Sequence, residues 1–232
     1  MKRVLLKLSG EALANGTDEL YDMSFVDKVS GVLKRCTEEG YEVAVVVGAG
    51  NIWRGRQGNN MDQTSADRMG MLATVINSIC LKDSLERVGA SASVMTAVPM
   101  APFAEIYSAE RASEYLSTGR IVIFGAGLGI PFLSTDTAGA VRAKEVGVHE
   151  ILMAKNVDYI YTDDPRKNPE AKKLTCVKAS EVLAMNLKAI DATATAFALA
   201  NSIPVKVFGL KEPEDIIRAV RGEIVGTEII PE

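Results

Sequence analysis

The sequence predicts an α/β fold with a mainly parallel sheet. Short apolar runs alternate with longer segments of helical period along the chain. The runs are apolar at nearly every residue, as strands are when helices cover both faces of a sheet. No linker rich in proline and serine divides the 232 residues, so we expect one domain, residues 1–232, whose second half begins near residue 150.

Five apolar runs are the expected strands. They occupy residues 4–8, 43–47, 121–124, 151–153 and 205–208. Each run is too short for a helix. Residues 223–230 are expected to form a final hairpin that turns at Gly226 and Thr227.

Four longer segments are the expected helices. They cover residues 24–39, 64–88, 135–147 and 191–201. In the second segment apolar residues recur at spacings of three and four, which predicts a stripe buried in the core. This stripe consists of Met69, Leu72, Ala73, Ile76 and Cys80. Met69 and Met71 are interpreted as core residues or as a contact between subunits.

The composition excludes several classes of protein. A formal net charge of -4 argues against nucleic acid or an anionic membrane as the main partner, because both favour a basic face. A His-based metal site or a Ser-His-Asp triad would depend on one histidine, His149. The three cysteines form no C-x-x-C pair, and the apolar run after Arg3 is too short for a signal peptide. We therefore expect a protein of the reducing cytoplasm without a membrane-spanning helix.

Three of the expected strands end in glycine-containing turns, at residues 9–10, 48–50 and 125–129. Ligands of parallel α/β sheets bind at the carboxyl ends of the strands, so these turns are expected to share one crevice. Glycine lets backbone N–H groups approach an anion, which favours a phosphate ligand, although turns from strand to helix often need glycine for geometry alone. The Gly-x-x-x-x-Gly-Lys-Ser/Thr loop is absent, and Ile130 breaks the Gly-x-Gly-x-x-Gly pattern that begins at Gly125.

Two basic residues lie beside these turns. Lys7 stands one residue before the end of its strand. It is either an edge-strand lysine that points to water or a cation held for the oxygens of a transferred phosphate, and the neighbouring Ser9 and Gly10 favour the second role. Arg54 follows the second turn and either binds phosphate or is a solvated loop residue.

Three aspartates have structural explanations of their own. The pattern Thr64-x-x-Asp67 is typical of a capping box at the start of the long helix. Asp136 lies in the first turn of its helix, where its charge complements the helix dipole. Asp191 precedes an alanine-rich helix and is interpreted as an N-cap.

Four segments together carry a family resemblance. They are residues 7–13 (KLSGEAL), 47–55 (VGAGNIWRG), 66–74 (ADRMGMLAT) and 131–136 (PFLSTD). They resemble the bacterial UMP kinases of the amino acid kinase family. The resemblance implies a three-layer α/β/α sandwich and ATP-dependent phosphorylation of UMP to UDP in pyrimidine nucleotide biosynthesis, a transferase reaction with Mg²⁺ bound to ATP. It also implies a cytoplasmic hexamer, activation by GTP and inhibition by UTP.

The resemblance assigns roles by position. It implies a phosphoacceptor half at about residues 1–150 and an ATP half at about residues 151–232. The implied catalytic residues are Lys7, Asp136 and Arg54. The implied ATP-binding residues are Lys7, Leu8, Ser9, Gly10, Gly50, Arg54, Lys155, Asn156, Tyr161 and Asp164. The implied UMP-binding residues are Ala49, Asp67, Leu128, Gly129, Ile130, Pro131, Phe132, Leu133, Ser134 and Thr135. No protein residue is assigned as a metal ligand.

The sequence departs from the family pattern where the uracil would lie. Leu128 and Ile130 stand in place of the usual threonine and asparagine, so two polar side chains are replaced by aliphatic ones. This departure keeps a second hypothesis open, a kinase of the same fold that acts on another small phosphate or carboxylate. A third hypothesis is an oligomer that binds nucleotides without turnover.

Overall fold

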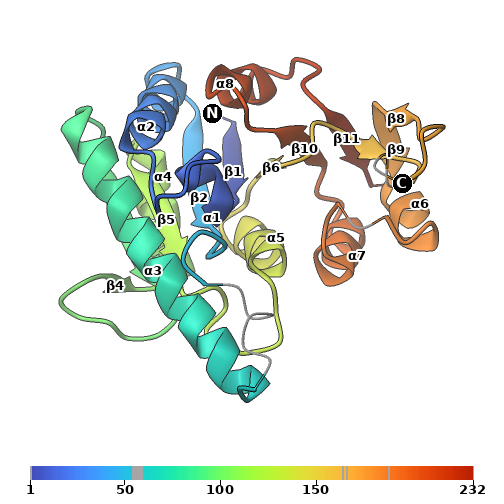
Figure 1. Cartoon of the computed structure of the whole chain (residues 1–232). Helices are drawn as coiled ribbons and strands as arrows, with labels where there is room; N and C mark the ends of the chain where they lie inside the picture. The colour runs from blue at the N-terminus through green and yellow to red at the C-terminus, as the bar shows by residue number, and fades with distance from the viewer. Residues whose placement is uncertain (1, 54–59, 164, 166, 188, 232) are drawn as a thin grey trace.

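The computed structural model describes the chain except for residues 1, 54–59, 164, 166, 188 and 232 (Figure 1). Within the described residues, nine strands form one twisted sheet. They are β1 (Arg3–Leu8), β2 (Glu42–Val47), β3 (Ala92–Thr96), β4 (Glu105–Ile106), β5 (Ile121–Gly125), β6 (Glu150–Lys155), β9 (Cys176–Lys178), β10 (Val205–Gly209) and β11 (Thr227–Ile230). Their order is β4-β3-β5-β2-β1-β6-β10-β11-β9, with only the β10–β11 pair antiparallel. The strands β7 (Ile160–Tyr161) and β8 (Lys173–Leu174) form a separate antiparallel pair.

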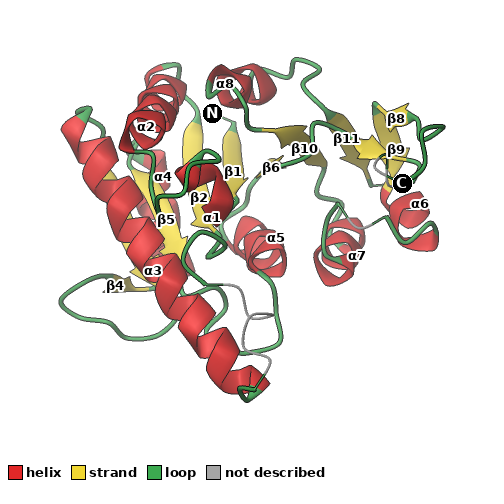
Figure 2. Ribbon diagram, in the orientation of Figure 1, coloured by secondary structure: helices red, strands yellow, loops and turns green. Residues whose placement is uncertain are grey.

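Helices cover both faces of the sheet, which confirms the α/β class (Figure 2). One face packs against α1 (Gly10–Ala14), α2 (Met23–Glu38), α3 (Gln63–Arg87) and α8 (Glu214–Val220). The other packs against α4 (Ala109–Ser117), α5 (Thr135–Glu145), α6 (Ala179–Ala184) and α7 (Ala192–Ala200). Side chains alternate along β1, so Leu6 joins the first core and Leu5 the second. Lys7 shares the face of Leu5 and therefore lies on the α5 side.

Most of the expected elements are present within a few residues of their predicted bounds. The five apolar runs are β1, β2, β5, β6 and β10, and the four helical segments are α2, α3, α5 and α7. The prediction of a final hairpin is wrong, because Thr227–Ile230 is a single strand that pairs with β10. Gly226, with φ of +137°, lies so close to β10 that a Cβ there would sit 2.1 Å from the carbonyl oxygen of Val207. At the point where a turn was expected, the backbone of Gly226 therefore packs directly on β10, and β11 begins at the next residue.

The helix α3 is oriented differently from the sequence prediction. Ala73 is buried as expected, but Met69, Leu72 and Ile76 are exposed. The sheet-facing side of α3 instead carries small, polar and a few larger apolar residues. They are Ala66, Ala73, Thr74, Val75, Asn77, Ser78, Leu81, Ser84 and Leu85. Among the residues that the structure describes, no helix combines the length and the apolar character needed to cross a membrane.

Candidate active site

The first two glycine turns touch each other through their backbones. The Gly48 N–H donates to the carbonyl of Leu8 at 2.8 Å, which ties the end of β2 to the end of β1. A Cβ at Gly10 would lie 2.5 Å from the nitrogen of Gly50 and 2.6 Å from the oxygen of Gly48. Only glycine fits at position 10 without displacing that backbone. On the other side, the Ser9 N–H approaches the carbonyl of Ala154 in β6 at 3.4 Å.

A buried charge cluster lies on the α5 side of these turns. The ammonium of Lys7 lies 2.8 Å from Oδ1 of Asp136, and that of Lys155 lies 2.5 Å from Oδ2. Lys7 comes from β1, Lys155 ends β6, and Asp136 lies in the first turn of α5 behind the N-cap Ser134. Lys7 is therefore not an edge-strand lysine that points to water, because β1 is central and the side chain is buried.

The electrostatics of this cluster favour an anion. Burial acts to raise the pKa of Asp136, but the charges of Lys7 and Lys155 outweigh it and lower this pKa to about 2. Burial and the charge of Lys7 lower the pKa of Lys155, while Asp136 opposes this. Two lysine ammonium groups share the carboxylate of Asp136 where water is scarce, and their remaining N–H donors can stabilise a ligand with negative charge.

Asp191 also belongs to this cluster, although it was interpreted from the sequence only as an N-cap. It occupies the N-cap position of α7, but its side chain makes no capping hydrogen bond there. Its Oδ2 instead accepts from the hydroxyls of Ser134 at 2.9 Å and Thr137 at 2.5 Å, both at the start of α5. Its N–H approaches Oδ2 of Asp136 at 3.4 Å. Asp191 thus links α7 to α5, and a side chain facing across to another helix has no signature in local sequence.

A pocket of about 200 Å³ lies beside the glycine turns. Its walls come from the second turn, α3, and the loop between β5 and α5. They are formed by Ala49, Gly50, Trp53, Ala66, Asp67, Gly70, Met71, Thr74, Gly127, Leu128, Ile130, Leu133 and Thr135. Six of the ten implied UMP-binding residues are among these walls: Ala49, Asp67, Leu128, Ile130, Leu133 and Thr135. Gly129, Pro131, Phe132 and Ser134 belong to the same loop but do not line this pocket.

The helix α3 holds the β5–α5 loop of this pocket. Asp67 is not part of a capping box, because Asp62 is the N-cap and accepts from the Ser65 N–H. The Oδ2 of Asp67 accepts from the Phe132 N–H at 2.8 Å. Further along, Oγ1 of Thr74 accepts from the Ala126 N–H at 2.9 Å. The same face of α3 therefore fastens the β5–α5 loop at two points.

Several lining residues were not identified from the sequence. Trp53 closes the pocket near α3, where its Nε1–H donates to the carbonyl of Ala66 at 2.9 Å. Ala66, Gly70 and Thr74 recur at a spacing of four on the pocket side of α3. That spacing was a usable signal, but the more apolar stripe on the opposite side of the helix dominated the sequence pattern.

A second pocket of about 420 Å³ lies in the C-terminal half. It is lined by Val157, Tyr159, Ile160, Tyr161, Thr162, Asp163, Pro165, Lys167, Met185, Asn186, Leu187 and Ala189. Of the implied ATP-binding residues, Tyr161 lines it and donates its hydroxyl to Oδ1 of Asp158 at 3.0 Å. Asn156 faces away to Glu11, whose Oε2 it reaches at 2.5 Å. Arg54 and Asp164 lie outside the described residues.

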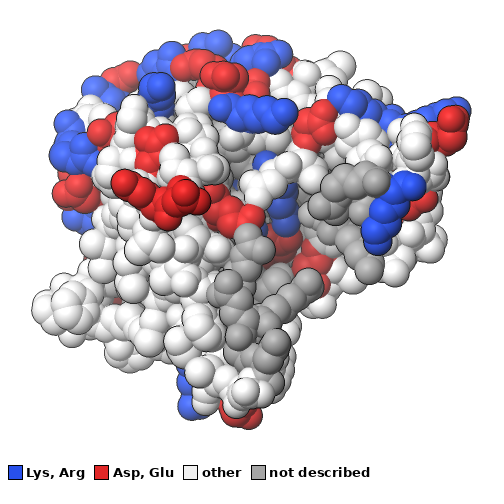
Figure 3. Space-filling view, in the orientation of Figure 1, with Lys and Arg blue, Asp and Glu red and all other residues white. Residues whose placement is uncertain are grey.

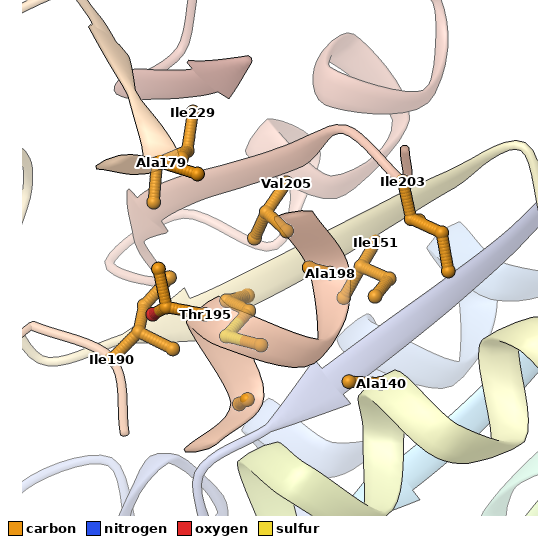
Figure 4. Close-up of a pocket in the computed structure, with 11 residues that line it drawn as sticks. Ala140, Ile151, Ala179, Ile190, Thr195, Ala198, Ile203, Val205 and Ile229 are labelled. Carbon is orange, nitrogen blue, oxygen red and sulfur yellow. The ribbon is translucent and has the colours of Figure 1, made fainter. Parts of the chain in front are cut away.

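A third, much smaller cavity of about 10 Å³ lies in the core between α7, β6 and β10 (Figure 4). Apolar side chains such as Ile151, Val205 and Ala198 surround it, and Thr195 is the one polar residue of its lining. It is too small for an organic ligand. We assign it to imperfect core packing.

A mainly parallel sheet with glycine turns beside a buried lysine pair is the arrangement of an α/β protein whose site suits phosphate groups. The chain belongs to the amino acid kinase family, whose family model matches residues 2–209. It is similar to the crystal structure of UMP kinase from Bacillus anthracis, with 37% sequence identity, a TM-score of 0.95 and coverage of 100% of this chain and 96% of that one. It is also similar to UMP kinase from Ureaplasma parvum, with 32% identity, a TM-score of 0.93 and coverage of 99% and 98%. These similarities confirm the family that the four sequence segments indicated.

Proposed function

We propose that this chain catalyses the ATP-dependent phosphorylation of UMP to UDP. The observation that carries the proposal is the buried cluster of Lys7, Asp136 and Lys155, in a chain 37% identical over its whole length to a UMP kinase structure. The 200 Å³ pocket would take the UMP, and the 420 Å³ pocket would take the nucleoside of ATP. The N-terminal half is then the phosphoacceptor half and residues 151–232 the ATP half.

The proposed chemistry needs positioning and charge neutralisation more than a base. The acceptor phosphate is already anionic, so no strong base has to remove a proton from it. Lys7 would stabilise the transferred phosphoryl group, Lys155 would neutralise charge on the donor side, and Asp136 would keep both ammonium groups in place. Backbone N–H groups of the glycine turns at Gly10 and Gly50 would bind phosphate oxygens.

Mg²⁺ would enter with ATP. The described residues contain no group of three His, Cys, Asp or Glu side chains that could hold a metal ion. Asp136 offers one ionised carboxylate, and Mg²⁺ in phosphoryl-transfer sites binds one or two carboxylates together with substrate phosphates. This donor set therefore fits a nucleotide-borne magnesium ion, which would neutralise charge on the phosphates.

The pocket proposed for the acceptor has an apolar wall where a base would lie. Leu128, Ile130 and Leu133 present no polar side-chain atom, so this wall cannot hydrogen-bond the edge of a pyrimidine through side chains. Backbone groups of the loop would have to read the base. This feature supports the second candidate function, phosphorylation of another small phosphate or carboxylate on the same lysine cluster.

Acceptor assays separate these candidates. The protein is incubated with ATP and Mg²⁺ and with UMP, CMP, dTMP, AMP or GMP in turn, and ADP is followed. We expect turnover with UMP well above that with the other acceptors. A clear preference for another acceptor would refute the UMP assignment, and binding of nucleotides without any ADP release would support the non-catalytic hypothesis.

The proposal includes self-association. Met69, Leu72, Ile76 and Ile79 lie on the outer side of α3 at spacings of three, four and three, and all four are exposed. The surface over the middle of α3 and the β4 loop carries few charged side chains (Figure 3). A row of exposed apolar side chains on a surface with few charges is typical of a protein contact. A hexamer, control by GTP and UTP, a cytoplasmic location and a role in pyrimidine biosynthesis belong to the same proposal.

A further inference from the structure

Asn77 is a fully buried amide at the centre of a hydrogen-bond network on α3. Its Nδ2 donates to the carbonyl of Gly48 at 2.7 Å and to Oδ1 of Asn51 at 2.8 Å. Its Oδ1 accepts from the hydroxyl of Tyr21 at 2.7 Å and from Nδ2 of Asn51 at 3.2 Å. An amide has two donors and two acceptor positions, so these partners use all of them.

The network has one arrangement that satisfies every partner. The carbonyl of Gly48 can only accept, so the NH₂ of Asn77 must face it. Burial raises the pKa of Tyr21 to about 12, so its hydroxyl keeps its proton and donates to the amide oxygen of Asn77. A buried polar side chain is costly unless it is fully paired, and a fully paired one fixes the geometry of its neighbours.

The groups that Asn77 holds belong to the second glycine turn. Gly48 and Asn51 flank Ala49 and Gly50, which line the 200 Å³ pocket. The turn is closed by the N–H groups of Ile52 and Trp53, which donate to the carbonyl of Ala49 at 2.9 and 2.8 Å. The position of these backbone groups therefore depends on a side chain that does not itself line the pocket.

Asn51 extends the network to the neighbouring segments. Its Nδ2 also donates to the carbonyl of Leu20 at 2.8 Å. A Cβ at Gly10 would lie 2.7 Å from its Oδ1, so the first glycine turn packs directly on the Asn51 amide. Asn77 thus fixes the point where the turns after β1 and β2 meet.

We propose that Asn77 is a positioning residue for the acceptor, an inference that rests on the proposed function. Its side chain clamps the Gly48–Asn51 turn so that the backbone amides of the turn fit the phosphate of UMP. A displacement of about 1 Å at a reacting group can cost on the order of 100-fold in rate, so a clamp on this backbone affects acceptor use strongly. The donor pocket lies in the other half and has no contact with this network in the described residues.

The test compares Asn77→Ala and Asn77→Asp with Ser84→Ala. Ser84 is also fully buried on α3, but its hydroxyl bonds Asp27 and Ser30 of α2, each at 2.7 Å, away from the glycine turns. We expect both Asn77 variants to raise the KM for UMP about 10-fold or more and the KM for ATP by a clearly smaller factor, because the network reaches the ATP side only through the glycine turns. Ser84→Ala should leave both KM values unchanged. Asn77→Asp keeps an acceptor for Tyr21 and for the amide of Asn51 but loses the donors to Gly48 and to Oδ1 of Asn51, so it removes the clamp while a side chain of similar size fills the site.

A second readout does not depend on the reaction. Trp53 is the single tryptophan of the chain and lies at the end of the clamped turn, so its fluorescence reports the turn directly. We expect a shifted emission in the Asn77 variants, a spectrum like that of the native protein in Ser84→Ala, and a weaker quenching of Trp53 by added UMP in the Asn77 variants. If both Asn77 variants fail to fold, Tyr21→Phe removes one of the four bonds and should raise the KM for UMP a few-fold.

The outcomes distinguish the clamp from the proposed function. Asn77 variants that match Ser84→Ala in KM for UMP and in Trp53 emission would overturn the clamp, and so would an unchanged Tyr21→Phe if that variant has to be used. Equal increases in the KM values for UMP and ATP would overturn it too, because they indicate a general loss of structure. A native protein that does not turn over UMP refutes the proposed function, while the emission of Trp53 still decides whether Asn77 holds the turn.

Discussion

At the scale of single residues, Lys7 is the side chain on which the proposed chemistry depends most. It is buried, it faces Asp136, and no other described lysine except Lys155 approaches that carboxylate. Replacement of Lys7 by alanine removes a preorganised cation from the transferred phosphoryl group, and losses of about 10²–10³-fold in kcat are typical when one such stabilising group is removed. We expect at least that loss in steady-state assays.

Lys82→Ala is the matched control for Lys7→Ala. Lys82 is a lysine on α3 whose one ion pair among the described residues is with Glu86, one helical turn away. Its removal should leave kcat unchanged. If Lys7→Ala lowers nucleotide affinity modestly and leaves turnover intact, Lys7 has no part in phosphoryl transfer.

Asp136 makes the stability of the protein sensitive to acid. Burial acts to raise its pKa, the two lysines act more strongly to lower it, and the net value is about 2 against an ordinary 3.8. A carboxyl whose folded-state pKa is depressed stabilises the fold above its unfolded pKa and loses this contribution as the pH falls through the folded value. We expect a loss of about 2 kcal/mol between about pH 5 and 2. Urea unfolding midpoints measured across this range should fall.

The variant Asp136→Asn checks the origin of this slope. It leaves Lys7 and Lys155 without their shared counter-charge, so at neutral pH we expect it to cost about 3–5 kcal/mol. Its stability should then fall less between pH 5 and 2 than that of the native protein. Glu86→Gln, which removes a half-exposed carboxylate on α3, should keep the native slope. An equal slope in Asp136→Asn would show that other carboxyls cause the acid sensitivity.

At the scale of elements, the contact between the turns after β1 and β2 depends on Gly10. A Cβ at this position would lie 2.5–2.7 Å from backbone atoms of Gly48 and Gly50 and from the Asn51 side chain, and the backbone atoms cannot move without opening the turn. We expect Gly10→Ala to lower kcat/KM by at least about 10²-fold through displacement of these amides. Gly31→Ala in α2 is the matched change, because a Cβ there meets nothing within 4 Å. It should stabilise the protein by about 0.5–1 kcal/mol with normal activity. Similar activities of the two variants would contradict the steric argument.

The elements also show where sequence reasoning succeeds. β1, β2, β5 and β6 are mainly runs of buried apolar residues, a pattern that local sequence reveals directly. β3, with Ser93 and Thr96 among its five buried residues, has no such run and was not predicted. In α3 the apolar stripe faces outward, so hydrophobic periodicity identified the helix correctly and its buried side wrongly.

The candidate site was predictable from the sequence only for residues whose place at the end of a strand already puts them in the site. Lys7 and the glycine turns stand at strand ends, so the parallel sheet alone predicts that they meet. Asp191 and Asn77 act on α5 and on the turn after β2, which lie 54 and 29 residues away in sequence. Such contacts depend on how helices pack across the sheet, and no local pattern encodes them.

At the scale of the whole molecule, the sheet explains how a chain with a net charge of -4 could bind the two anionic nucleotides of the proposed reaction. The order β5-β2-β1-β6 places the glycine turns of β1, β2 and β5 and the lysines of β1 and β6 side by side at one edge. Backbone N–H groups and two ammonium groups supply the positive potential locally. Apart from Asp136 and Glu150, no described acidic residue is buried, so solvent and salt screen the other negative charges. Net charge therefore carries no information about this ligand.

The exposed stripe of α3 makes the oligomeric state the property of the whole molecule that is simplest to test. Leu72 and Ile76 are each 51% exposed at the middle of this stripe, and an apolar surface of that kind gains free energy when a second copy covers it. We expect light scattering to give the native protein a mass of several chains, and Leu72→Glu with Ile76→Glu to give a smaller species, because a buried unpaired carboxylate is strongly unfavourable. Ile224→Glu changes an even more exposed apolar residue, at 78%, that lies outside the stripe, and it should keep the native mass. A native protein that is monomeric, or a double variant of unchanged mass, would show that this side of α3 does not mediate self-association.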